Sequence, residues 1–541
     1  MVAAAAVTLA LVAAAVGQLV DGVQLLDERV LFEIRARDVF TGDHPLLGLR
    51  SSASESGVQI NHPGPLFFEL LALPVRLLGG PVGVTVGLAL LTIALVWILA
   101  LAANALGGQI TAVVMTAIAA ALCWSMGSDL LLDAWTPNAL VLPFFALLVT
   151  TAATAGGQWR WLPAVVALAS LCAQSNLGYL LLGPAMVASA VGAIVGASRR
   201  TGRPVPWRLL GLSGALGLVL WLPPIVQQLF GPGPGNLAAV LAGSGDGAPR
   251  YGPSIALRLY SAVVAVPPAW LRPGYDRQPA EALTESRNGA LVIDDSGLPS
   301  VVVALLIVLL VAALVVAALV SARRRRDVTM PPLVLVVATA TGTALLTLAL
   351  LPTDFFGIVA HKYRFLWPLA AFTTGALAAH VLHLAASAQS PALRRLAIVG
   401  PLAVAVMFAA LTMPSRLQPA IDGTNRDVWP AVAELRMQLS DQPLAGPVVV
   451  ETGGLQFPDV FTNAVLAELS RRAISFQVAS DVQVRQLGEG RRVDGTGVTR
   501  LLVWVGSGAT APPGSRTVAF VDGGAPEHTA TVYAEPLVPG G

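Results

Sequence analysis

The sequence predicts a polytopic α-helical membrane protein with a small α/β domain at its C-terminal end. Three observations lead to this fold class. Hydrophobic residues make up 55% of the 541 residues and charged residues only 12%, and the mean hydropathy is +0.72. Apolar runs of about twenty residues recur, which is the length that a helix needs to cross a hydrocarbon core about 30 Å thick. After residue 413 the chain becomes more polar and rich in short β-type runs.

Arginine-rich loops set the orientation of the predicted spans. Arg199 to Arg208, Arg323 to Arg326 and the pair Arg394–Arg395 are expected in the cytoplasm, because basic loops stay on that side. They place the C-terminal tail outside, whereas twelve spans from a cytoplasmic N-terminus would return it inside. We therefore expect that one span between residues 62 and 138 has been either missed or counted in excess. The predicted number of transmembrane helices is eleven to thirteen. The apolar runs are 1–20, 64–79, 83–105, 109–126, 139–155, 162–176, 179–198, 209–230, 298–321, 331–352, 364–385 and 396–413.

Several classes of protein are excluded by composition. Cys123 and Cys172 both fall inside apolar runs, so neither a disulfide framework nor a thiolate metal site is expected. A basic stripe with interleaved aromatic residues is missing, which argues against a nucleic-acid partner. The first apolar run lacks a basic start and precedes many more spans. A retained helix is therefore favoured over a signal peptide.

The predicted domains are a transmembrane domain at 1–413 and an extracytoplasmic α/β domain at 414–541. Two long outer loops are expected within the first, at about 21–63 and 231–297. In the second, apolar runs predict strands at 447–451, 474–478, 501–505 and 517–521. Apolar positions three and four residues apart predict a helix at 459–472.

The first outer loop begins with two adjacent carboxylates, Asp27 and Glu28. The spacing of apolar residues from Asp27 to Phe40 predicts an amphipathic helix on the outer membrane surface. Its charged residues are expected on the polar side, namely Glu33, Arg35, Arg37 and Asp38. A carboxylate at the start of this helix is suited to act as a general base in a partly desolvated cavity. The alternative is structural: an acid at this position caps the helix and complements its dipole.

The segment HKYRFLWP, from His361 to Pro368, precedes a span on the outer side. It contains Lys362, the one lysine among 33 basic residues, together with His361 and Arg364. Phosphate recognition favours such a cluster, with arginine as a bidentate donor and lysine as a point charge. The alternative is anchoring, because Lys, Arg, Tyr and Trp all favour the headgroup layer.

Other polar residues near the outer ends of spans are candidates too. His62 lies in the rigid turn NHPGPL and either contacts a donor phosphate or caps the turn. Asp133, Trp135 and Asn138 either line a sugar site or hold neighbouring elements in place.

The order of these parts resembles the GT-C superfamily of membrane glycosyltransferases. The segments that carry the resemblance are DERVLFEIRARDVFTG, PLLG and NHPGPLFFELLALPVRLLGG, followed by LLLDAWTPNALVLPFF and WLPPIVQQLFGPGPGNL. They are most similar to actinobacterial members akin to protein mannosyltransferases, aminoarabinose transferases and arabinofuranosyltransferases. The resemblance covers roughly the first 240 residues and, more loosely, residues 354–370.

The resemblance implies a multi-pass plasma-membrane enzyme whose site lies on the extracytoplasmic side. It would move a sugar from a polyprenyl-phosphate donor to a hydroxyl of a cell-envelope glycan, lipid or protein, by inversion, and without a metal or cofactor. Asp27 corresponds to the general base, with Glu28 as its rival. The expected phosphate contacts are His62, His361, Lys362 and Arg364, and the candidate sugar or acceptor contacts are Asp38, Asp133, Trp135 and Asn138. The competing interpretation is a non-enzymatic transporter or a protein that binds lipid-linked sugars without turnover.

Overall fold

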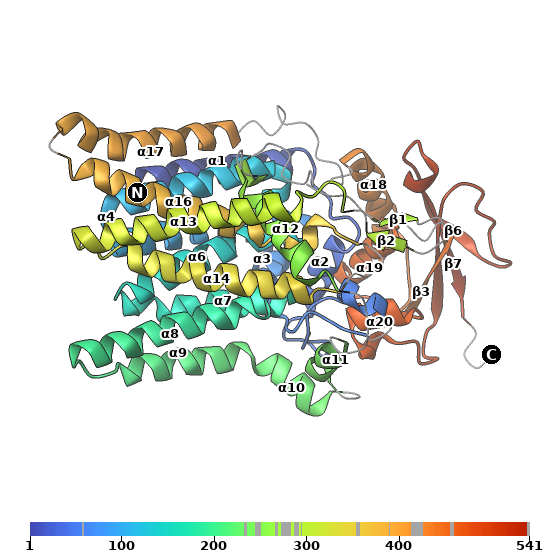
Figure 1. The fold of residues 1–541 in the computed structure, drawn as a ribbon. Coiled ribbons are helices and arrows are strands. Elements are labelled where there is room, and N and C mark those ends of the chain that lie inside the picture. The colour runs from blue at the N-terminus through green and yellow to red at the C-terminus, as the bar shows by residue number, and fades with distance from the viewer. Residues whose placement is uncertain are drawn as a thin grey trace.

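The molecule consists of a bundle of apolar helices with a strand-containing part at one end (Figure 1). The computed structural model describes residues 1–56, 59–231, 235–243, 250–265, 269–271, 283–285, 291–293, 295–352, 357–388, 390–412, 426–454 and 459–537. Much of the predicted outer loop at 231–297 therefore lies outside the described residues. Its described elements are α11 (Asn236–Gly243), α12 (Gly252–Val264), β1 (Leu283–Glu285) and β2 (Leu291–Ile293).

In the described part of the chain, eight helices are long and apolar enough to cross a membrane. A ninth span is the pair α9 (Trp207–Leu220) and α10 (Leu222–Phe230), bent by 53°. The eight are α1 (Val2–Val20), α4 (Gly80–Leu131), α6 (Val141–Ala155) with the short α5 (Thr136–Ala139), α8 (Leu182–Thr201), α13 (Val301–Arg325), α14 (Met330–Leu350), α16 (Leu366–Ala386) and α17 (Pro391–Thr412). The predicted polytopic helical fold is confirmed.

Helix α4 consists of two limbs that run in opposite directions. Its 52 residues would measure about 78 Å if straight, far more than a bilayer core. The backbone breaks at Gly107 and Gly108, where φ of Gly108 is +68°. Gly107 lies against Thr329, just before α14, whereas the carbonyl oxygen of Ser128 accepts a hydrogen bond from Gln18 near the end of α1. The two limbs therefore supply two spans.

The span predicted at 64–79 is wrong. Helix α3 (Leu66–Leu78) has 13 residues, about 20 Å. Both of its ends lie at the same end of the bundle. Phe67 lines a cavity there, and Gly80, just beyond α3, contacts the Glu33 side chain. The expected miscount between residues 62 and 138 is thus this helix.

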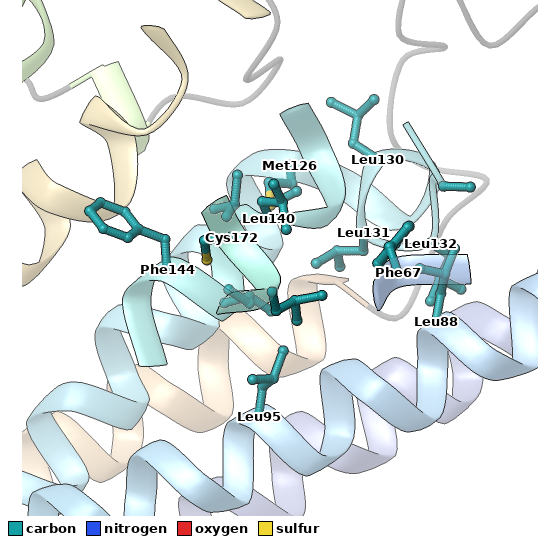
Figure 2. Close-up of a cluster of buried hydrophobic side chains, with 14 of the residues drawn as sticks. Phe67, Leu88, Leu95, Met126, Leu130, Leu131, Leu132, Leu140, Phe144 and Cys172 are labelled. Atoms are coloured by element: carbon teal, nitrogen blue, oxygen red, sulfur yellow. The ribbon is translucent and has the colours of Figure 1, made fainter. Parts of the chain in front are cut away.

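Without α3, eleven segments cross the bundle within the described residues, which agrees with the odd number that the arginine loops require. Helix α7 (Leu162–Ser175) completes the set, because Gly156, shortly before it, lies against Leu106 and Pro332 near the break in α4, whereas Ser175 at its end lines the cavity. Figure 2 shows how both limbs of α4 share one core with α3 and α7. The core side chains include Leu95 and Met126 from the two limbs, Phe67 and Cys172. Both cysteines are buried and free.

The C-terminal part is an α/β structure with five strands in the order β4-β3-β5-β7-β6. Strand β3 pairs in parallel with β4 and β5, and β7 pairs antiparallel with β5 and β6. All four predicted strands and the predicted helix are present, whereas β7 was not predicted. The elements are α18 (Trp429–Ser440), β3 (Val448–Gly454), α19 (Thr462–Arg471), β4 (Phe476–Val478), α20 (Asp481–Leu487), β5 (Thr499–Val505), β6 (Arg516–Asp522) and β7 (Thr529–Pro536).

The amphipathic helix expected on the membrane surface is buried instead. Helix α2 (Arg29–Asp38) lies between α3 and α19, and eight of its ten residues are buried. Its carboxylates are neutralised by the C-terminal part: Glu33 pairs with Arg436 of α18 at 3.0 Å. The polar face of α2 thus contacts the C-terminal part. The periodicity of the sequence does not distinguish a polar face that contacts protein from one that contacts water.

Candidate active site

A cavity of about 800 Å³ lies between the bundle and the C-terminal part. Six of the ten predicted site residues line it, although they come from four separate segments of the chain. They are Asp27, Glu28, His62, Trp135, His361 and Lys362. The other four, Asp38, Asp133, Asn138 and Arg364, are not part of the lining.

Asp27 and Glu28 immediately precede α2 and face the cavity. Asp27 has a φ of +51°, a left-handed conformation that residues other than glycine rarely adopt. Glu28 occupies the N-cap position of α2 but makes no side-chain capping bond. Among the described residues, neither carboxylate group forms a hydrogen bond or an ion pair, so the helix-capping interpretation is not supported.

The surroundings of the two acids raise both of their pKa values. Burial is the main cause of the raised pKa of Asp27; Arg29 opposes it, while Asp459 and Asp133 add to it. Burial also raises the pKa of Glu28, with Arg29 opposing and Asp27 reinforcing the shift. A carboxylate with a raised pKa is a stronger base once it is ionised, which suits proton abstraction near neutral pH.

A small hairpin positions His62 in the cavity wall. The Gly48 amide donates to the His62 carbonyl at 3.0 Å, and the His62 amide donates to the Leu49 carbonyl at 2.9 Å. A side chain at Gly48 would collide with His62, so the strands approach this closely only because residue 48 is glycine. Burial lowers the pKa of His62 to about 4. The ring is therefore neutral at pH 7 and offers one donor and one acceptor.

Cationic side chains line another part of the cavity wall. Lys362 lies in α15 (Ala360–Tyr363), donates to the Gly357 carbonyl at 3.2 Å and stands 5.9 Å from the Tyr251 ring centroid. The hydroxyl of Tyr251 donates to the same carbonyl at 2.6 Å. This contact brings the neighbouring Arg250 into the cavity lining beside Lys362. Burial, together with Lys362 and Arg364, lowers the pKa of His361 to about 3, so His361 is uncharged at pH 7.

A buried chain of polar contacts supports this wall from behind. Asp133 binds the Arg29 guanidinium in a bidentate pair, at 2.6 and 2.9 Å. The Asn138 amide donates to Asp133 at 2.8 Å and its oxygen accepts from Arg364. Trp135 lies between, with the Arg29 guanidinium 5.7 Å and the His361 ring 5.3 Å from its ring centroid. Asp133, Asn138 and Arg364 are placed to orient Arg29 and α15 rather than to touch a ligand in the cavity.

Asp38 lies at the far end of α2. Its carboxylate accepts hydrogen bonds from Arg491 at 2.6 and 2.9 Å and from Arg35 at 2.6 Å. The structure thus places Asp38 in the contact between α2 and the C-terminal part.

Eight charged or amide-bearing lining residues were not among the sequence candidates: Arg29, Arg50, Asn176, Arg250, Asp459, Asn463, Gln483 and Gln486. Arg29 and Arg50 lie in the first outer loop. Their positive charge, in the same loop as the acid pair, was the sequence signal that could have identified them as site residues. The last four come from α19, α20 and the turn before α19. Nothing in their local sequence indicates that these elements cover a site more than 400 residues away.

Apolar spans that end at a cavity with charged lining residues, covered by an α/β layer, define a polytopic membrane protein. The solved structures that it resembles have the GT-C fold, as expected. ArnT from Cupriavidus metallidurans, an aminoarabinose transferase whose structure was solved with bound undecaprenyl phosphate, matches with a TM-score of 0.54. That match covers 98% of this chain and 97% of ArnT, at 13% identity.

The apo structure of the same ArnT matches with a TM-score of 0.50, again over 98% and 97% of the two chains and at 13% identity. An apo oligosaccharyltransferase from Archaeoglobus fulgidus covers 87% of this chain and 68% of its own at 11% identity, with a TM-score of 0.35, too low to equate the two structures. No family model matches the sequence, and no curated protein matches it.

Proposed function

We propose that this chain is a membrane glycosyltransferase that takes a sugar from a polyprenyl-phosphate donor and transfers it to a hydroxyl group of an acceptor. The observation that carries the proposal is that one cavity joins an unpartnered acid pair to a group of cations. A base for the acceptor and positive charge for a leaving phosphate are the two requirements of such a transfer.

The lining of the cavity also suits a lipid-linked donor. An apolar side lies between the start of α8, α11 and the end of α14, formed by Leu177, Leu180, Leu181, Val240, Leu350 and Leu351. Leu181 is 41% exposed. A polyprenyl chain is able to follow such a rim from the bilayer, while its phosphate reaches Lys362 and Arg250. The bound undecaprenyl phosphate of ArnT is the same class of molecule.

The mechanism follows from these positions. Asp27, with Glu28 as its neighbour, accepts the proton of the acceptor hydroxyl. The hydroxyl oxygen then attacks the anomeric carbon of the sugar as the bond from that carbon to the phosphate oxygen breaks. The departing lipid phosphate keeps the electron pair, and Lys362 and Arg250 stabilise its charge. A single displacement of this kind inverts the anomeric centre.

The site would face the extracytoplasmic side. The arginine-rich segments at 199–208, 323–326 and 394–395 connect spans at the end of the bundle opposite the C-terminal part (Figure 1). Because basic loops remain in the cytoplasm, the cavity and the C-terminal α/β domain, which we take as residues 414–541, would lie outside.

The test is sugar transfer by the purified protein in detergent, with labelled polyprenyl-phosphate arabinose and mannose as donors. Wild type would be compared with Asp27→Asn and Glu28→Gln, and with Glu434→Gln as a control carboxylate on the exposed side of α18. Loss of transfer and of donor hydrolysis in Asp27→Asn alone would identify the base. Equal activity in all four proteins would refute the mechanism. Donor binding without turnover in wild type would favour a protein that only binds lipid-linked sugars.

A further inference from the structure

The two walls of the cavity differ sharply in charge. The wall formed by the membrane part contributes four cations, Arg29, Arg50, Arg250 and Lys362, beside the acid pair of Asp27 and Glu28. The wall formed by the C-terminal part contributes one carboxylate and three amides, from Asp459, Asn463, Gln483 and Gln486. Among the described lining residues, this second wall carries no cation. A ligand that spans the cavity therefore meets positive charge on one side and neutral or negative hydrogen-bonding groups on the other.

Side chains on the C-terminal wall keep free hydrogen-bonding capacity. Asp459 uses one oxygen, Oδ1, to accept from the amides of Phe461 and Thr462 at 3.0 Å each, which caps α19. Within the described residues its second oxygen has no partner. Gln483 and Gln486 lie three residues apart on one face of α20, and neither side-chain amide is hydrogen-bonded to a described residue.

Helix α20 is nevertheless held firmly in place. Arg485 binds the Asn61 side-chain oxygen with its Nε atom. The Asn61 amide donates back to the Arg485 carbonyl at 3.2 Å and to the Gly48 carbonyl at 2.8 Å. The one arginine of α20 is thus used to fix the helix to the hairpin that carries His62. Its two glutamines remain available to the cavity, in a fixed position.

The candidate base lies at the boundary between the two walls. Asn463 of the C-terminal wall donates to the Asp27 carbonyl at 3.0 Å, and Asp459 is close enough to raise the pKa of Asp27. A general base must lie within about 3 Å of the hydroxyl that it deprotonates. With the donor phosphate on the cationic wall, the acceptor hydroxyl has to approach Asp27 from the C-terminal side.

We infer that the C-terminal wall is the acceptor subsite and that its acceptor is a neutral polyhydroxylated molecule, an oligosaccharide. This inference rests on the proposed glycosyl transfer. Sugar hydroxyls both donate and accept hydrogen bonds, and amides beside a carboxylate satisfy both roles. A phosphate-bearing acceptor would instead face the Asp459 carboxylate without a compensating cation on that wall, which is electrostatically unfavourable.

The experiment measures transfer to four acceptors by wild type, Gln483→Ala and Gln486→Ala. The acceptors are neutral mannose and arabinose hexasaccharides, a phosphate-bearing glycolipid, and a serine-containing peptide. We expect transfer to a hexasaccharide, with its KM roughly five- to tenfold higher in each variant and kcat much less affected. Thermal unfolding of each variant establishes that it is folded. Asp481→Asn is the matched control, because this first residue of α20 is exposed and paired with Arg492 outside the cavity.

Each contrary outcome is distinct. Transfer to the glycolipid or the peptide but not to either hexasaccharide would overturn the acceptor assignment and leave the proposed function intact. An unchanged acceptor KM in both glutamine variants would show that the acceptor does not bind to the C-terminal wall. Neither transfer nor donor hydrolysis with any acceptor would refute the proposed function, and the acceptor subsite with it.

Discussion

The side-chain amide of Asn463 donates a hydrogen bond to the backbone carbonyl oxygen of Asp27, with 3.0 Å between the two heavy atoms. The bond connects α19 to the acid pair that precedes α2 and contains the candidate base, 436 positions earlier in the chain. Asp27 has a φ of +51°, a conformation that costs a residue with a Cβ atom roughly 1–2 kcal/mol. The C-terminal part thus helps to hold the candidate base in this backbone conformation.

Removal of this bond is expected to slow transfer without weakening donor binding. Asn463→Ala deletes the donor, and Asn463→Asp keeps the size but replaces the amide with an acceptor. Because misplacement of a catalytic group by even 1 Å is costly, we expect kcat to fall roughly tenfold or more in both variants while the donor KM changes little. A fall in kcat for the alanine variant but not for the aspartate variant would show that the hydrogen bond is not responsible.

The pH dependence of transfer should respond to Asp459. The base works in its ionised form, so the rate rises as pH increases through its pKa. That pKa is raised above the ordinary value chiefly by burial, and the negative charge of Asp459 contributes. Asp459→Asn removes this charge and therefore lowers the pKa of Asp27, so the rising limb of the kcat/KM profile should move to lower pH. An unchanged profile, or one displaced to higher pH, would contradict the assignment of Asp27 as the base; Asp481→Asn serves as the control.

Lys362 and Arg364 are expected to behave differently, although the sequence groups them together. Lys362 lines the cavity, so Lys362→Ala should weaken binding of undecaprenyl phosphate roughly tenfold, and Lys362→Arg should retain most of the affinity. Arg364 is 2% exposed and bonded to Asn138. Arg364→Lys should therefore lower the free energy of unfolding by about 1.5–3 kcal/mol and leave affinity unchanged in the folded fraction. Equal losses of affinity in Lys362→Ala and Arg364→Lys would show that both residues contact phosphate.

Asp38 is predicted to stabilise the contact between α2 and the C-terminal part. The side chains of Asp38, Arg35 and Arg491 are only 6%, 7% and 9% exposed, so Asp38→Asn would leave two buried cations with only the more exposed Asp43, 3.7 Å from Arg491, to compensate them. Loss of one partner from a buried ion pair typically costs about 3–5 kcal/mol, and thermal unfolding in detergent should show a clear decrease in Tm.

Arg492→Ala provides the control for this measurement. Arg492 follows Arg491 directly but pairs with Asp481 at the surface, where the side chains are 47% and 85% exposed. Exposed ion pairs contribute little to stability, so the Tm should remain unchanged. Similar decreases in Tm for both variants would show that the burial of the Asp38 ion pair does not account for its contribution to stability.

Much of the fold was predictable because it depends on local chain properties. The length of an apolar run decides whether a helix is able to cross the bilayer, and α1, α13 and α17 were recognised in this way. Short apolar, β-rich runs identified β3 and β5. The approach was wrong for α3, whose apolar composition resembles a span. What distinguishes α3 is that both of its ends contact residues at the same end of the bundle, which no local pattern records.

For the candidate site, the sequence by itself identified the acid pair and the segment around Lys362, because charges at the rim of a membrane are costly and therefore conspicuous. Only the tertiary structure decided which charged groups share the cavity. It buried Asp38 and Arg364 in supporting contacts, and it brought Asn463 and Gln483 onto the wall beside Asp27. The physical reason is that periodicity and composition report whether a side chain prefers water or lipid. The partner of a buried polar group is set by how distant segments pack together.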